Sequence, residues 1–235
     1  MWNWLRSLAA FTRYSANQVF AGKFVYFLLL ALLTFCTVVI VHTVQEEVPP
    51  NPEAIYYFLL VPGVLLTFYP SAYCVQSDVD GRMIETLFGI PNYRYKVWLA
   101  RHLVQHLVVA VLLLLLAIVC EAALADFSVG AMVIHLMFPI LFLSSIGFML
   151  ATLIRGSGNG VATILLIIIM VFWMTKSAAG GTRWDLYLNP FEQADSYENI
   201  ALDAAVLYNR IYLLVGAVAA TLLGLLRLQK REKFV

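Results

Sequence analysis

The chain of 235 residues is 62% hydrophobic and 12% charged, with a mean hydropathy of +0.85. Soluble domains are typically about 45–50% apolar and about 25% charged, so this composition excludes an ordinary soluble protein. A formal net charge of +1 gives no reason to expect a nucleic-acid partner. The sequence therefore predicts a single membrane domain over residues 1–235.

Residues 1–22 predict an amphipathic helix that lies in the membrane interface. Trp2, Leu5 and Leu8 fall on one side of such a helix, and Arg6 and Arg13 lie elsewhere around it. Tryptophan and arginine in this arrangement suit the headgroup region. A simple polar tail is the alternative interpretation.

Six apolar stretches are expected to cross the membrane as α-helices. A crossing of ~30 Å of hydrocarbon takes about 20 helical residues. The expected spans are residues 24–43, 55–75, 97–121, 129–154, 161–174 and 208–226. The fold class is therefore all-α and polytopic. Pro62 and Pro70 are expected to kink the second span, because proline removes a helical hydrogen bond.

Two further features of the spans predict helix packing. Small residues in the fourth and sixth spans permit close helix approach, although the sequence does not reveal which face meets which. These residues are Ser144, Ser145, Gly147, Gly216, Ala217, Ala219 and Ala220. Arg210, at the start of the last span, is expected either to pair with Asp203 or to extend to a lipid headgroup.

Residues 76–96, between the second and third spans, carry most of the charge that interrupts the apolar runs. A short amphipathic piece at 83–88 ends at Gly89 and Pro91, which stop a helix. Such a segment cannot lie in hydrocarbon, so it is expected to lie on the membrane surface or against a partner protein.

This loop resembles the one that follows the second span in type-2 ATP-binding-cassette (ABC) exporter permeases. The shared pattern is an acidic pair, glycine, hydrophobic-Glu-x-Leu, Pro-x-x-Arg and a further basic residue. The matching residues are Asp78, Asp80, Gly81, Glu85, Leu87, Pro91, Arg94 and Arg101. The family usually has Glu at the positions of Asp78 and Asp80, often Thr at Arg82, and usually Lys at Arg101. The layout of the spans extends the resemblance to nearly the whole chain.

The resemblance implies a transport subunit, not an enzyme, and no cofactor. In the family, a short coupling helix in this loop docks on a separate ATPase subunit. Two ATPase copies and a second permease half, identical or related, would complete the transporter. Asp78, Asp80, Arg82 and Glu85 would make the polar contacts with the ATPase. Met83, Leu87 and Phe88 would fill its apolar groove, and Pro91 would fix the exit of the loop. No G-x-x-x-x-G-K-[ST] motif occurs in the chain, so ATP hydrolysis would belong to another polypeptide.

The distribution of basic residues predicts the orientation. With both termini and the loops near 77–101 and 155 on one side, that side holds twelve of the fifteen Lys and Arg residues. Such an excess marks the cytoplasmic side. The termini are therefore expected in the cytoplasm, residues 177–207 on the outside, and the protein in a bacterial or archaeal cytoplasmic membrane.

Other functions remain open on the sequence. His102 and His106 are four residues apart, hence on one helical face, and could bind a metal ion or haem. A haem-export type of permease has a similar length and span count. A scaffold that anchors a soluble protein is a third possibility.

Overall fold

The computed structural model describes residues 24–45, 49–80, 94–154, 157–179, 182–192 and 196–228. Six long α-helices lie in these ranges: α2 (Phe24–Gln45), α3 (Pro52–Asp80), α5 (Ala100–Ala123), α6 (Val129–Leu153), α7 (Gly158–Ala179) and α8 (Ser196–Arg227). A π-helical turn, η1 (Arg94–Leu99), leads directly into α5. All six helices are long and apolar enough to cross a membrane. The prediction of an all-α integral membrane protein with six spans is confirmed.

Two predicted elements, the interfacial helix at 1–22 and the coupling helix between the second and third spans, lie outside the described residues. Three helices extend well beyond the predicted spans. α3 continues to Asp80, α7 covers Gly158–Ala179, and α8 begins at Ser196 instead of near 208. The predicted extracytoplasmic segment at 177–207 therefore includes helical residues at both of its ends, from α7 and α8. Hydropathy marks only the part of a helix that suits the bilayer, and these helices continue into polar sequence.

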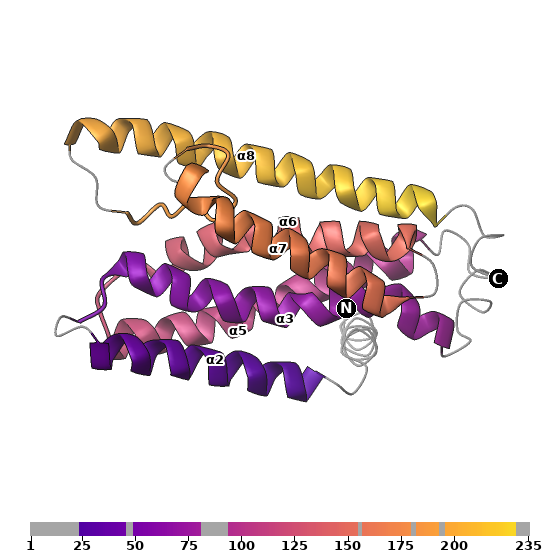
Figure 1. Cartoon of the computed structure of the whole chain (residues 1–235), viewed down its shortest axis with the longest axis horizontal. Helices are drawn as coiled ribbons and strands as arrows, with labels where there is room; N and C mark the ends of the chain where they lie inside the picture. Colours follow the sequence, from indigo (N-terminus) through magenta and orange to yellow (C-terminus); the bar gives the residue numbers. More distant parts are fainter. Residues whose placement is uncertain are drawn as a thin grey trace, which may run out of the picture.

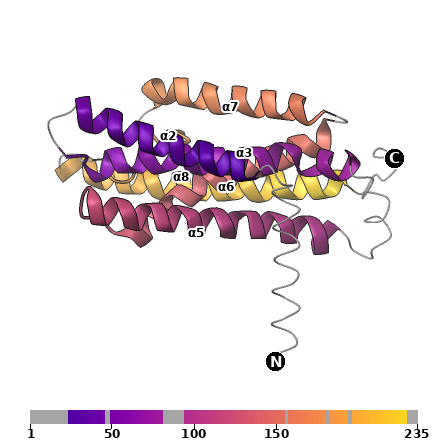
Figure 2. The same ribbon diagram turned by 90° about the horizontal axis from the view of Figure 1, so that it is seen from below.

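The helices form one bundle around α3 and α6. Figure 1 shows α8 and α2 along opposite edges of the bundle, and Figure 2 shows α7 along one side and α5 along the opposite side. In the most apolar part of each span, 72% of α3 and 50% of α6 is buried, against 11% of α2 and 17% of α7. The spans of α2 and α7 are therefore the least buried of the six.

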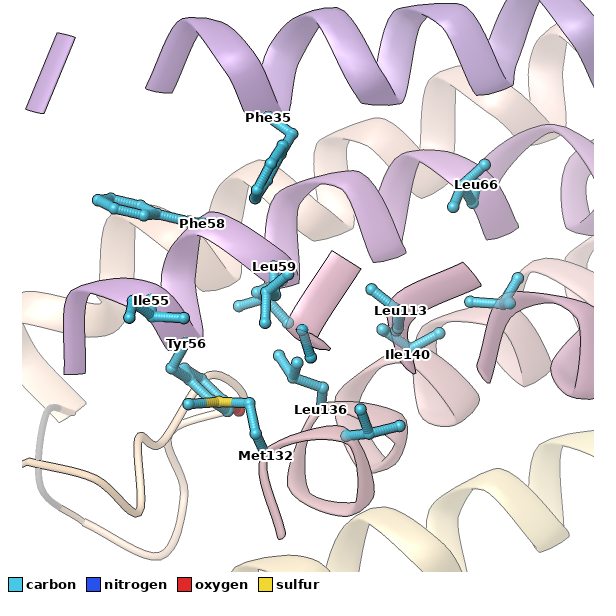
Figure 3. Close-up of a cluster of buried hydrophobic side chains, with 14 of the residues drawn as sticks. Phe35, Ile55, Tyr56, Phe58, Leu59, Leu66, Leu113, Met132, Leu136 and Ile140 are labelled. Carbon is cyan, nitrogen blue, oxygen red and sulfur yellow. The ribbon is translucent and has the colours of Figure 1, made fainter. Parts of the chain in front are cut away.

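The main core lies where α3, α5 and α6 meet. Leu59, Leu113, Leu136 and Ile140 have no accessible surface, and Figure 3 shows them clustered with Phe35 of α2 approaching from above. Lipid tails are as apolar as leucine, so close packing, more than exclusion from water, stabilises such a core.

Gly147 of α6 and Gly216 and Ala217 of α8 serve contacts inside the chain. A Cβ atom on Gly147 would stand 2.7 Å from Cβ of Ser71 in α3, and one on Gly216 would stand 2.6 Å from the Phe142 ring in α6. Ala217 is also buried, with 1% of its surface exposed. The predicted close approach of these helices is confirmed, and it joins α8 to α6 and α6 to α3.

α3 remains a single helix through Pro62 and Pro70. Hydroxyl groups beside Pro70 bond to the preceding turn: Thr67 donates to the Val64 carbonyl at 3.0 Å, and Ser71 donates to the Thr67 carbonyl at 2.6 Å. Pro70 removes the amide that would bond the Leu66 carbonyl, and these hydroxyl groups bond carbonyls on either side of it.

The two ends of the bundle differ in what they carry. At the Asp80 end, α3 ends and η1 begins, and a second apolar cluster joins helices around Trp98. It comprises Ala72, Val75, Trp98, Phe148, Ala151, Val161, Leu225 and Leu228. At the opposite, Asp185 end, residues 182–192 fold back against the helices (Figure 1).

Candidate functional site

The predicted coupling segment begins and ends on helical elements at the Asp80 end. Asp78 and Asp80 form part of the last turn of α3, and Arg94 is the first residue of η1. The remaining predicted coupling residues lie outside the described residues: Gly81, Arg82, Met83, Glu85, Leu87, Phe88 and Pro91. Thirteen residues, 81–93, therefore connect two helical elements that meet in the second apolar cluster.

Trp98 anchors the turn that follows this segment. Its side chain is 3% exposed, its ring centroid lies 6.2 Å from that of Phe148 in α6, and the Arg101 guanidinium carbon lies 5.2 Å from the ring. The turn is a π-helix, a rare form that is often found at functional sites. The exit of the coupling segment is thus attached to α6 as well as to α5.

A polar network crosses the bundle between α3, α5 and α6. Gln105 Nε2 donates to Ser71 Oγ at 3.0 Å and to Ser144 Oγ at 3.1 Å, and it has a longer contact of 3.4 Å with the Thr67 carbonyl. Ser71 uses its own proton on the Thr67 carbonyl, so Ser144 donates across the 2.9 Å contact with Ser71. We call these four residues the Gln105 network.

The network lies inside the apolar span. Gln105 is eight residues into the span that starts at Val97, which is about 12 Å along a helix. Gln105, Ser71 and Ser144 are each at most 4% exposed. Polar groups at such a depth are expensive unless they bond to one another, and they often mark functional positions.

The Gln105→Leu variant is expected to lower the free energy of unfolding by about 1 kcal/mol, because hydrogen bonds between membrane helices are individually modest. Unfolding by sodium dodecyl sulfate in mixed micelles, followed by circular dichroism, measures it. Thr34→Val is the matched control, since the Thr34 hydroxyl is exposed and bonds only to Leu30 of its own helix. Equal effects in the two variants would show that the interhelical bonds contribute nothing.

The two histidines of the sequence analysis lie one turn apart beside this network. Their ring centroids are 4.4 Å apart in an edge-to-face arrangement. His102 Nε2 lies 3.2 Å from Ser145 Oγ, which also accepts a bond from Thr221 of α8 at 3.2 Å. His106 Nδ1 lies 2.6 Å from the His102 carbonyl, which only accepts, so this nitrogen carries the proton.

The remaining nitrogen of His106, Nε2, is buried and has no hydrogen-bond partner among the described residues. It carries the lone pair that a metal ion would need. Within the described part of the chain, however, no group of three or more His, Cys, Asp or Glu side chains is placed to hold a metal ion. The pair alone is thus an incomplete metal site.

A second polar site, at the Asp185 end, was not foreseen from the sequence. Residues 185–189 are at most 3% exposed, although this stretch looks like part of a polar loop. Asn209 Nδ2 donates to the carbonyls of Arg183 at 3.0 Å and Asp185 at 2.8 Å, and Asn189 Nδ2 donates to the Glu53 carbonyl at 3.0 Å. The segment is thereby tied to both α8 and α3.

Tyr187 connects the same segment to α7. Its hydroxyl lies 3.3 Å from the Ile169 carbonyl, and its ring packs edge-on against Trp173 at 5.4 Å. Burial and the nearby Asp185 carboxylate raise the pKa of Tyr187 above its usual value, so the hydroxyl keeps its proton and donates. The Asp185 carboxylate accepts the Tyr187 backbone N–H at 2.9 Å, the local bond that shapes an Asx turn.

Arg210 is the buried cation of this site, with 5% of its surface exposed. Nη2 donates to the Leu188 carbonyl at 2.9 Å, Nη1 to Asn209 Oδ1 at 2.9 Å, and Nε to His135 Nδ1 at 3.4 Å. The expected alternatives, a pair with Asp203 or an extension into the headgroups, are wrong. Asp203 is exposed, and Arg210 points into the protein, where carbonyl groups receive its donors.

Comparison of the chain with protein-family models, with curated proteins and with solved structures finds no match.

Proposed function

We propose that the chain is the membrane subunit of an ABC exporter, driven by a separate ATPase that docks on residues 78–91. The observation that supports this most is the coincidence of motif and position. The stretch that resembles the coupling loop connects the end of α3 to η1, and both flanks meet in the second apolar cluster. A movement of the loop would therefore reach α3, α5 and α6 together.

The proposed mechanism follows from that attachment. ATP binding closes the pair of ATPase subunits, and the coupling helix moves with them. Polar contacts to the ATPase come from Asp78, Asp80, Arg82 and Glu85. The apolar groove of the ATPase is filled by Met83, Leu87 and Phe88. The coupling segment also includes Gly81, Pro91 and Arg94. Trp98 passes the displacement to α6, and the spans shift between inward-open and outward-open or extruding states.

The Asp80 end faces the cytoplasm in this proposal, because the sequence places twelve of its fifteen basic residues on that side. The membrane is the cytoplasmic membrane of a bacterium or archaeon. A second permease half, identical or related, packs against α2 and α7, because these spans have the least cover within the chain, 11% and 17%. Gly147 and Gly216, which would allow tight packing elsewhere, are already used between α3, α6 and α8.

Affinity purification of the full-length protein in detergent from its native host, followed by mass spectrometry, tests the proposal. We expect a nucleotide-binding ATPase in stoichiometric amount. The double variant Glu85→Ala with Leu87→Ala should lower its recovery about tenfold or more, because two truncations in an interface can each cost over 1 kcal/mol. Glu121→Ala with Leu115→Ala is the matched control, since both residues are exposed on α5 and remote from the loop.

Three results would overturn this assignment. Full recovery of the ATPase by the Glu85/Leu87 variant would exclude the loop as the docking site. A coloured or metal-loaded protein without any ATPase would favour the alternative that uses His102 and His106, and a soluble partner that binds no nucleotide would favour a scaffold.

A further inference from the structure

A cation and two aromatic rings form a stack on the surface at the Asp185 end. The exposed Trp184 ring lies parallel to the Tyr212 ring of α8, with centroids 5.0 Å apart and an interplanar angle of 8°. The Arg183 guanidinium carbon lies 5.2 Å from the centre of the Trp184 ring. We call Arg183, Trp184 and Tyr212 the Trp184 stack. None of the three takes part in the proposed coupling mechanism.

The stack is held in place by buried bonds beneath it. Asn209, which is 2% exposed, donates from one amide nitrogen to the carbonyls on both sides of Trp184, those of Arg183 and Asp185. The rings and the cation are thus positioned before any ligand arrives. Little conformational entropy would be lost when one binds.

Arg183 and Trp184 lie in the segment between the last two candidate spans, Gly158–Thr175 and Ala201–Arg227, where a headgroup region is expected. α8 ends its apolar span at Arg227, and Tyr212 lies fifteen residues earlier, about 22 Å along the helix. A hydrocarbon core of ~30 Å measured from Arg227 ends about five residues beyond Tyr212, so Tyr212 lies in the outer part of the apolar stretch of α8. Tryptophan and tyrosine concentrate at this boundary in membrane proteins.

The charge of Arg183 is available for an anion. Its side chain is exposed, and its guanidinium lies over the Trp184 ring. Next to it, α8 presents an exposed apolar face with Tyr208, Ile211 and Val215 at 50%, 47% and 61% exposure. The exposed cation can bind an anionic group, and the apolar face of α8 can cover a hydrocarbon chain. An amphipathic molecule carries both kinds of group.

We infer that the Trp184 stack binds a membrane phospholipid, with the headgroup phosphate on Arg183 and the acyl chains along Ile211 and Val215. The planar guanidinium matches a phosphate oxygen pair, which the compact ammonium of lysine does not. The inference does not depend on the proposed transport function, since it concerns a different end of the bundle.

Quenching of Trp184 fluorescence by brominated lipid tests this inference on the full-length protein reconstituted in bilayers. The difference between the native chain and Trp184→Phe isolates the emission of Trp184. In mixtures of brominated phosphatidylglycerol with a phosphate-free galactolipid, quenching should exceed that expected from the bulk composition. Arg183→Gln should reduce the relative affinity for the phospholipid about fivefold, as expected for one basic residue near a membrane surface.

Two further variants and a competition experiment test whether the phosphate group and the acyl chains both contribute to binding. Arg183→Lys should retain part of the preference, and Arg227→Gln, at the far end of α8, should retain all of it. Excess inorganic phosphate should leave the quenching unchanged, because the acyl chains supply part of the binding. Quenching that follows the bulk composition in the native chain, an unchanged preference in Arg183→Gln, or displacement by inorganic phosphate would overturn the inference.

Discussion

The Arg210→Ala variant is expected to lose about 3 kcal/mol of unfolding free energy, the largest effect of any single side-chain truncation that we predict. Three acceptors on three different elements receive its donors: the Leu188 carbonyl, Asn209 Oδ1 and His135 Nδ1. Removing a buried charged donor leaves such acceptors unsatisfied, which costs about 1–3 kcal/mol for each group left without a partner. Truncation also leaves a void beside the Phe138 ring, over which the guanidinium lies.

Unfolding in sodium dodecyl sulfate measures the total effect, and hydrogen exchange locates it. Amides of 182–192 should lose protection first, because Arg210 and Asn209 hold this segment against α8. Arg210→Lys should be intermediate, since one ammonium cannot reach all three acceptors. Asp203→Ala removes the partner that the sequence suggests and should change stability by less than about 0.5 kcal/mol, as exposed substitutions usually do. A larger loss in Asp203→Ala than in Arg210→Ala would refute the buried-cation account.

The sequence was sufficient to predict the number and approximate positions of the spans, because hydropathy over twenty residues is a strong, local signal. Hydropathy did not predict where the helices end: α8, for example, starts at Ser196. Residues 196–203 include Glu198 and Asp203, which cannot lie in hydrocarbon but readily form helix outside it. A change to polar composition therefore marks where the chain leaves the hydrocarbon region, and the helix can continue beyond that point.

The polar sites could not be read from the sequence for a different reason. Ser144 and Ser145 suggested only close packing, yet they accept bonds from Gln105 and Thr221. Ser71 and Ser144 are 73 positions apart, and their pairing depends on the rotation of α3 against α6. Residues 182–192 contain turn formers that indicate a surface loop, and only tertiary structure shows that 185–189 are buried.

The docking loop, unlike the polar sites, can be predicted from a short stretch of sequence. The structure adds which helices its two ends contact. Asp78 to Pro91 is recognisable because its pattern is contiguous in sequence. The structure adds that the flanks of this loop, α3 and η1, meet around Trp98 and Phe148. A test of coupling therefore requires changes in the loop and in the packing between helices.

Gly147→Leu is the packing change with the largest expected effect, a loss of about 3 kcal/mol from overpacking. A Cβ atom there would stand 2.7 Å from Cβ of Ser71 and 3.0 Å from the end of Leu165. Leu165 can rotate, but Cβ of Ser71 moves only with the backbone of α3. Displacing Ser71 would also break its bonds to Gln105 and Ser144, so the clash and the loss of the network add together.

Gly130→Leu is the matched control, because a Cβ atom at this position of the same helix meets nothing within 4 Å. It should leave stability within about 0.5 kcal/mol of the native value or raise it, since leucine favours helix more than glycine does. Unfolding midpoints in sodium dodecyl sulfate, compared for the two variants, give the result. Equal midpoints would mean that α3 and α6 can separate at Gly147 without cost, and the Gln105 network would then have to bridge a wider gap than its 3.0 Å and 3.1 Å bonds allow. A low midpoint for Gly147→Leu alone would show that this contact sets the distance at which the hydroxyls of α3 and α6 meet.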